Sequence, residues 1–278
     1  SATMCVMEQS VQMKGFYGDL ATYNETVLDI SDSTKDFFSK RHPAYTRSLI
    51  GVTIIAVIVS LFFLPFLILA IAIPIIAYWR VRVRMAHLFY TQLATIIGMT
   101  YEPSSDRSTV SGYFFSVGRG GPMANVLTGI YEGAPIRLYE YQFVTGSGKH
   151  KQTHPFIVSE IDTGGTLPHV FMKPEGFSVF GKPSGTKLLS LEGNFNEHFD
   201  VYVPEDSEIE ALQILEPDVM VKLIDEFSAF GFECSGTKTY VFKPGTFADN
   251  RESLVAHIRL LERLYDELIP ELKSVARS

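Results

Sequence analysis

The sequence predicts a membrane-anchored α+β protein, in which a transmembrane helical hairpin is followed by an antiparallel β-rich domain with C-terminal helices. Three observations support this prediction. Residues 48–79 contain no charged side chain, short β-branched and aromatic runs dominate the middle of the chain, and helical periodicity returns near its end. We expect an N-terminal amphipathic helical segment over 1–44, the transmembrane hairpin over 45–84 and a cytoplasmic α+β domain over 85–278.

Composition limits the classes of partner. The 278 residues include 24 Lys and Arg against 31 Asp and Glu, so the formal net charge is −7. Nucleic-acid binding needs a clustered basic face, and we therefore expect no nucleic-acid partner. The two cysteines, Cys5 and Cys234, make neither a CxxC pair nor a disulfide framework, which favours a reducing, cytoplasmic environment.

The uncharged block is too long for one span and short for two. As a single helix, residues 49–79 would extend about 46 Å, against a hydrocarbon core of about 30 Å. Pro65 lies near the middle, where a proline interrupts helical hydrogen bonding and a hairpin would turn. Each arm would then be about 22 Å long. Such a hairpin must thin the bilayer, rely on snorkelling arginines or enter one leaflet.

Basic side chains flank the block on both sides, namely Lys40, Arg41, Arg47, Arg80, Arg82 and Arg84. Because positive residues prefer the cytoplasmic side, a hairpin with both ends inside satisfies both clusters. The alternative is one kinked, tilted span with Tyr45, Tyr78 and Trp79 as interface anchors. We expect Pro65 as the membrane hinge and, at the membrane interface, Arg47, Tyr78, Trp79, Arg80, Arg82 and Arg84.

Before the block, Leu20, Tyr23, Val27 and Ile30 recur at spacings of three and four. This periodicity predicts an amphipathic helix over 19–39, ended by the His-Pro pair at 42–43. Its apolar face would dock another subunit or the membrane surface, or fold back on the chain's own domain.

After the block, a helix is expected to continue from Arg80 to a cap at Gly98. Strand-like runs then follow without intervening helices, which predicts antiparallel pairing. The expected strands are residues 110–117, 126–131, 136–145, 156–161, 169–172, 178–180, 187–191 and 199–203.

Helical patterns return after residue 207. We expect helices at 208–215 and from Pro217 to about Gly231, then a strand pair at 232–235 and 239–242 turned by Gly236. A closing helix would cover the sheet or continue as an intersubunit seam. Its candidate oligomer contacts are Leu254, Ile258, Leu261, Tyr265 and Leu268.

The motifs that suggest chemistry are weak. The Gly-Ser-Gly-Lys run at 146–149 lacks the spacing of a phosphate loop, so we expect a hairpin tip. His150 and His154 have zinc-like spacing but no accompanying HExxH glutamate. Arg119 begins an Arg-Gly-Gly-Pro turn, and the acidic run at 200–210 fits a solvated face. We expect no cofactor and no metal, and the sequence identifies no catalytic residue.

One stretch resembles a known family. The resemblance rests on Leu191, Glu192, Phe195, Asn196, Phe199, Val201, Tyr202, Asp206, Glu210, Ala211, Ile214, Leu215, Pro217, Met220 and Leu223. These residues resemble the pattern of an uncharacterised bacterial membrane-protein family, a domain of unknown function with a transmembrane hairpin before a C-terminal cytoplasmic α+β domain. The resemblance implies the bacterial inner membrane, a cytoplasmic soluble domain and a LemA-like membrane partner. It implies no reaction.

Two functions are consistent with these observations. The favoured one is a non-enzymatic integral membrane scaffold or interaction protein that self-associates or binds a membrane partner. The alternative is a membrane-bound hydrolase or ligand-binding domain whose pocket gathers distant residues such as His169, Glu192 and His198. A homo-oligomer is expected through the membrane block, because small residues permit close helix approach. They are Gly51, Ala56, Ser60, Ala70 and Ala72.

Overall fold

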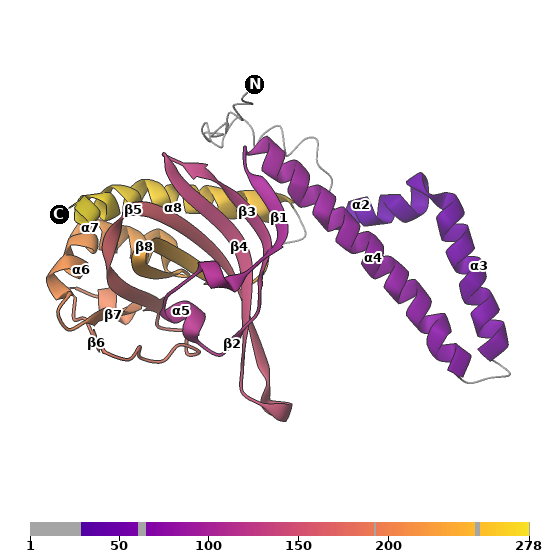
Figure 1. Cartoon of the computed structure of the whole chain (residues 1–278), viewed down its shortest axis with the longest axis horizontal. Coiled ribbons are helices and arrows are strands. Elements are labelled where there is room, and N and C mark those ends of the chain that lie inside the picture. Colours follow the sequence, from indigo (N-terminus) through magenta and orange to yellow (C-terminus); the bar gives the residue numbers. More distant parts are fainter. Residues whose placement is uncertain (1–28, 61–64, 192, 248–250, 278) are drawn as a thin grey trace, which may run out of the picture. The chain divides into compact units, whose positions relative to one another are not determined.

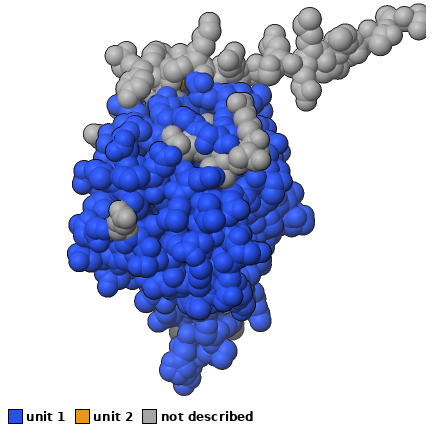
Figure 2. Space-filling view, turned by 90° about the vertical axis from the view of Figure 1, so that its left-hand side faces the viewer, with its two compact units in different colours: residues 1–16, 97–247, 256–278 blue, residues 17–96, 248–255 orange. Residues whose placement is uncertain are grey.

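The computed structural model describes residues 29–60, 65–191, 193–247 and 251–277 (Figure 1). They divide into two compact units. The helical unit contains the described residues up to Ile96 together with 251–255, and the sheet unit contains Ile97–Phe247 and the remainder of the C-terminal helix. Figure 2 shows one face of the sheet unit in blue.

The helical unit begins with α2 (Ile30–Asp36), which continues into a π-helix, η1 (Phe37–Arg41). Residues 19–28 of the predicted amphipathic helix lie outside the described residues. The helix ends before Pro43 as predicted, since a residue preceding proline disfavours helical geometry. Ile30 and Thr34 are buried, and the Thr34 hydroxyl donates to the Ile30 carbonyl oxygen.

Two long helices follow, α3 (Pro43–Ser60) and α4 (Pro65–Ile96), and they contact one another. Pro65 is the first residue of α4, where a proline costs no helical hydrogen bond. Residues 61–64, between the two helices, lie outside the described residues. α4 continues beyond Arg80 to Ile96, and Gly98 follows with φ 70°, as the sequence predicts.

The sheet unit contains eight antiparallel strands, which confirms the predicted antiparallel domain with helices. The order is β1-β3-β4-β5-β7-β6, with β2 against β4 and β8 against β5. The bounds are β1 Thr100–Ser105, β2 Arg119–Gly120, β3 Met123–Tyr131, β4 Ala134–Thr145, β5 Gln152–Pro174, β6 Thr186–Leu188, β7 Phe199–Pro204 and β8 Gly231–Pro244. The sequence missed β1, an edge strand that contains Pro103, because proline lowers the strand signal.

Two predicted breaks are absent. The expected strands at 156–161 and 169–172 are parts of β5, whose register against β8 shifts between Asp162 and Leu167 and again before Val170. The predicted hairpin at Gly236 is also wrong, because both halves of β8 pair with β5. Gly236 lies opposite Leu167 with φ 65°, so the glycine accommodates the bend of a continuous strand.

The predicted strand at 110–117 is wrong as well. This segment contains α5 (Tyr113–Ser116), preceded by a 3-10 turn, η2 (Arg107–Thr109). The carboxylate of Glu233 on β8 accepts hydrogen bonds from the backbone N–H groups of Tyr113, at 2.5 Å, and Phe114, at 2.8 Å. These bonds come from a residue about 120 positions away, which no local pattern reveals. Residues 178–180 likewise form no strand.

The sheet unit buries one aromatic face and one aliphatic face. On the first, Phe114 of α5 stacks on Phe242 with centroids 4.2 Å apart, in a cluster that contains Tyr139, Phe143 and Phe156. The other face is covered by α8 (Arg251–Arg277). The remaining elements are η3 Gly148–His150, η4 Phe195–Glu197, α6 Glu208–Ile214 and α7 Pro217–Phe227.

Candidate membrane-binding surface

Isoleucine and valine side chains are exposed along both arms of the helical unit. On α3, six of them are 45% to 63% exposed, and on α4 four isoleucines are 51% to 71% exposed. They are Ile50, Val52, Ile54, Ile55, Val57, Ile58, Ile68, Ile71, Ile75 and Ile76. On α3 these side chains spread over more than half of the helix circumference, whereas the four on α4, at positions i, i+3, i+7 and i+8, lie on one face of the helix. Contiguous exposed apolar surface of this kind marks a protein or membrane interaction site.

An aromatic cluster joins three elements of the helical unit. The rings of Phe38 and Tyr78 are stacked, with centroids 6.4 Å apart, and Tyr45 lies 5.9 Å from Phe37 and 6.2 Å from Phe38. Thr46 donates a hydrogen bond from its hydroxyl to the Phe38 carbonyl oxygen. The cluster therefore connects η1 to the start of α3 and to α4 next to Trp79.

The predicted interface residues lie beside this cluster. Arg47 is in the second turn of α3, and Tyr78 to Arg84 form a continuous part of α4. Most of their side chains are exposed, including Trp79 at 61%, whereas Arg82 is half-buried. The uncharged arms, 48–60 and 65–79, are about 20 and 22 Å long at the helical rise of 1.5 Å per residue.

Within the described residues, no individual helix is both long and apolar enough to cross a bilayer. The pair Ile30–Arg41 and Pro43–Val59 meets that criterion only together, and the two helices are bent by 88° at the break between them.

The predicted oligomer contacts on α8 are in the core. Leu254, Ile258, Leu261, Tyr265 and Leu268 are at most 5% exposed. Ile258 and Leu261 face the sheet side chains of Ile136 and Leu138 across a narrow interstice, and the Tyr265 hydroxyl donates to Ser159. An intersubunit seam needs exposed side chains, so packing on the chain's own sheet explains the positions of Ile258, Leu261 and Tyr265.

The structure does not bring His169 and His198, two members of the proposed catalytic set, together. Nε2 of His169 lies 2.9 Å from Oε1 of Glu233, a residue that the sequence did not single out. His198 follows η4, and its carbonyl oxygen accepts from the N–H of Glu175. Because Glu175 lies six residues beyond His169 along extended chain, the two histidines are about 20 Å apart in that direction. Glu192 lies outside the described residues.

Two buried carboxylates of the sheet unit, Glu233 and Glu160, have structural partners. Glu233 is fully buried and holds α5, as described above. Glu160 is paired with Arg137 at 2.6 Å and Lys238 at 2.7 Å. Burial, and then the Glu160 carboxylate, raise the pKa of Tyr139 well above its ordinary value. Both carboxylates are thus held by hydrogen bonds or ion pairs to neighbouring groups.

The histidines and cysteines of the sequence motifs also do not form a common site. His150 is exposed at the tip of the β4–β5 hairpin, where the sequence predicts a tip, whereas His154 bonds the hydroxyl of Thr145. Burial raises the pKa of the Cys234 thiol to about 12, and Cys5 lies outside the described residues. Among the residues that the structure describes, no group of three or more His, Cys, Asp or Glu side chains is arranged to hold a metal ion.

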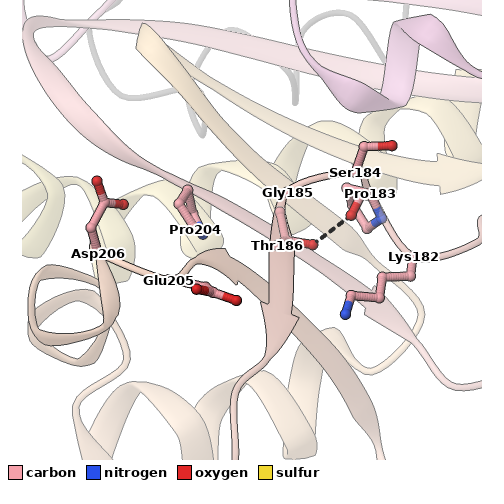
Figure 3. Close-up of a pocket in the computed structure, with 8 residues that line it drawn as sticks. All are labelled: Lys182, Pro183, Ser184, Gly185, Thr186, Pro204, Glu205 and Asp206. Atoms are coloured by element: carbon pink, nitrogen blue, oxygen red, sulfur yellow. Dashed lines mark hydrogen bonds between the residues drawn. The ribbon is translucent and has the colours of Figure 1, made fainter.

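A shallow surface hollow lies between the loop before β6 and the end of β7. Figure 3 shows Lys182 and Asp206 at opposite ends of it, and the bond drawn there joins the Thr186 hydroxyl to the Pro183 carbonyl oxygen at 2.8 Å. The charged side chains that line the hollow do not converge on one point.

No protein-family model and no curated protein matches the chain. Among solved structures, it is similar to the mycobacterial trehalose monomycolate transport factor A, TtfA, with 18% identity and a TM-score of 0.47. The match covers 66% of this chain and 93% of that protein.

Proposed function

We propose that the protein is a non-enzymatic membrane scaffold, attached to the bilayer by insertion of the helical hairpin α3–α4. The observation that carries the proposal is the set of exposed Ile and Val side chains on both uncharged arms. Full burial of an exposed Ile or Val side chain contributes about 1.5 to 3 kcal/mol, and burial of each of these half-exposed side chains contributes about half of that. In water, these apolar side chains would stay exposed to solvent along two consecutive helices, and the protein would not gain this free energy.

The length of the arms defines how the hairpin would enter. At about 20 Å, each arm is shorter than a hydrocarbon core of about 30 Å. We infer a hairpin that enters from one side, with Arg47 and Arg80 among the headgroups. Because basic flanks prefer the cytoplasmic side, the sheet unit would be cytoplasmic, on the inner membrane of a bacterium. A single kinked span is the second candidate, and it would place one basic cluster on the far side.

Labelling tests the two orientations. Cysteines introduced by Ser10→Cys and Ser274→Cys should both react with a membrane-impermeant reagent only after the cytoplasmic side is opened. If one of them reacts from outside in intact cells and the other does not, the hairpin with both ends inside is wrong and the single span replaces it. If both react from outside, the cytoplasmic orientation is wrong.

Fluorescence tests insertion itself. Trp79 is the only tryptophan of the chain, so its emission reports on α4 alone. In liposomes, we expect brominated lipids to quench it, and the variant Ile55→Asp/Ile71→Asp to lose quenching because two charges would enter hydrocarbon. The matched control is Ile209→Asp/Val221→Asp, at exposed apolar positions of the sheet unit. Unquenched Trp79 in the unmodified chain would contradict the proposal.

Self-association is the scaffold's expected activity. Helical arms shorter than the hydrocarbon core are mismatched with the bilayer, and association with neighbouring hairpins lowers the free-energy cost of this mismatch. Small residues allow close packing of the helices. A LemA-like membrane protein is the alternative partner. Particle masses measured in nanodiscs, without and with such a protein, distinguish self-association from binding of a partner.

A further inference from the structure

The β4–β5 hairpin projects from the sheet unit (Figures 1 and 2). Its two strands pair from Ile136–Ile161 to Thr145–Gln152. The partners on either side end earlier, since β3 pairing reaches Glu140 and β8 pairing stops at Phe156. Beyond those points, β2 pairs with β4 at Phe143 and Val144, and the N–H of Gly121 donates a hydrogen bond to the carbonyl oxygen of Gln142.

The projecting part is well defined by its contacts. Phe143 lies 5.2 Å from the ring of His154 and stacks on Phe156 at 5.6 Å. The hydroxyl of Thr145 lies 2.8 Å from Nε2 of His154. Gly146 has φ 73°, and a Cβ there would overlap the carbonyl oxygen of His150. The tip is therefore a closed turn on a stiff stem.

The tip is basic although the chain is acidic. Between Glu140 and Glu160 the sequence contains no carboxylate, while Lys149, His150 and Lys151 follow one another at the exposed tip. In the part of the chain that the structure describes, neither lysine forms an ion pair. This concentration of positive charge contrasts with the net charge of −7 for the whole chain.

The tip has no large apolar side chain that could be buried in a pocket of a partner protein. From Thr145 to Thr153 it contains no Phe, Tyr, Trp, Leu, Ile, Val or Met side chain. Protein interfaces depend on buried Trp, Tyr or Arg side chains, which this segment lacks. Diffuse attraction between lysines and an anionic lipid surface needs no such anchor.

We propose that the β4–β5 tip, through Lys149 and Lys151, is a second membrane contact that binds the anionic headgroups of phospholipids. This inference rests on the proposed function, because insertion of the helical hairpin keeps the tip at high effective concentration near a lipid surface. The tip would then restrict the sheet unit to one range of orientations at that surface, where a partner binds.

The experiment uses the full chain in nanodiscs of phosphatidylcholine, with or without about a third of phosphatidylglycerol. A fluorophore on Ser147→Cys, in a Cys5→Ser background, reports proximity to headgroup-labelled lipid, and Cys234 is buried and shielded from the label. We expect energy transfer to rise with phosphatidylglycerol and to fall in 0.5 M salt. Each lysine near an anionic surface contributes a factor of roughly five to binding. Lys149→Gln/Lys151→Gln should therefore lower the ratio of headgroup-bound to unbound tips about 25-fold. Lys182→Gln/Lys222→Gln, which removes the same charge elsewhere in the sheet unit, should leave it unchanged.

Quenching of Trp79 separates the two proposals. If Trp79 is quenched by brominated lipid but the Ser147 signal is equal in both lipids, the headgroup contact is wrong while insertion stands. If Trp79 is not quenched, the proposed function fails. A Ser147 signal that depends on the number of chains per disc, and not on phosphatidylglycerol, would overturn the inference by assigning the tip to a second copy.

Discussion

The rings of Phe38 and Tyr78 stack with their planes 12° apart, which joins the π-helix η1 to α4 just before the basic residues. An aromatic pair contributes about 0.5 to 1.5 kcal/mol beyond its buried area. We expect Phe38→Ala to release η1, so that trypsin cleaves after Lys40 and Arg41 several-fold faster. Phe38→Tyr keeps the aromatic ring and should be cleaved at the rate of the unmodified chain. Equal cleavage rates for both variants would show that the stacking does not hold η1.

Glu233 should be important for stability and not for catalysis. Glu233→Gln keeps the shape but has one acceptor oxygen where the carboxylate has two, so the N–H of either Tyr113 or Phe114 loses its hydrogen bond. We therefore expect a loss of about 1.5 to 3 kcal/mol in the free energy of unfolding. Glu233→Ala should cost more, because it leaves buried N–H groups unpaired. Chemical unfolding followed by near-ultraviolet circular dichroism measures both, and His169→Gln, at the partly exposed partner, is the milder control. Wild-type stability of Glu233→Ala would contradict this role.

The buried imidazole of His257 should make the folded chain less stable in acid. Burial, and then Lys243, lower its pKa from 6.5 to about 4 in the folded chain. The unfolded chain therefore binds a proton first, and the stability contributed by neutral His257 is complete above pH 6.5 and is lost as the pH falls toward 4, up to roughly 3 kcal/mol. Unfolding free energies at pH 7.5 and 4.5 should differ less in His257→Phe than in the exposed control His150→Gln. An unchanged pH dependence in His257→Phe would contradict the assignment.

Gly51 tests self-association through α3. A Cβ at Gly51 would meet no atom within 4 Å, so Gly51→Leu should leave the fold of one chain unchanged. If a second copy packs closely on α3, the added side chain blocks the approach and lowers the mass measured in nanodiscs. Ile54→Leu, at an exposed position of the same helix, is the volume-matched control. An unmodified chain that is monomeric in native-like lipid removes the basis for a self-associating scaffold.

Local patterns predicted the elements whose partners are near in sequence or whose periodicity is strong. Alternation of apolar residues, proline positions and helical spacing predicted the strands β3, β4 and β7 and the helices α6 and α7. The failures at 110–117 and at Gly236 have a common cause. In both places the backbone conformation depends on a distant element, Glu233 in the first and the bent β5 in the second.

The sequence by itself determined the antiparallel α+β class, the two uncharged arms with basic flanks and the acidic character of the remainder, because each of these depends on composition or short-range periodicity. Only the tertiary structure decided that the Leu254 to Leu268 ladder lies in the core, and that His169 pairs with Glu233 while His198 lies elsewhere. It also decided that the basic tip projects beyond its neighbouring strands. The physical reason is that strand register and strand length decide which remote residues meet, and no linear pattern encodes either.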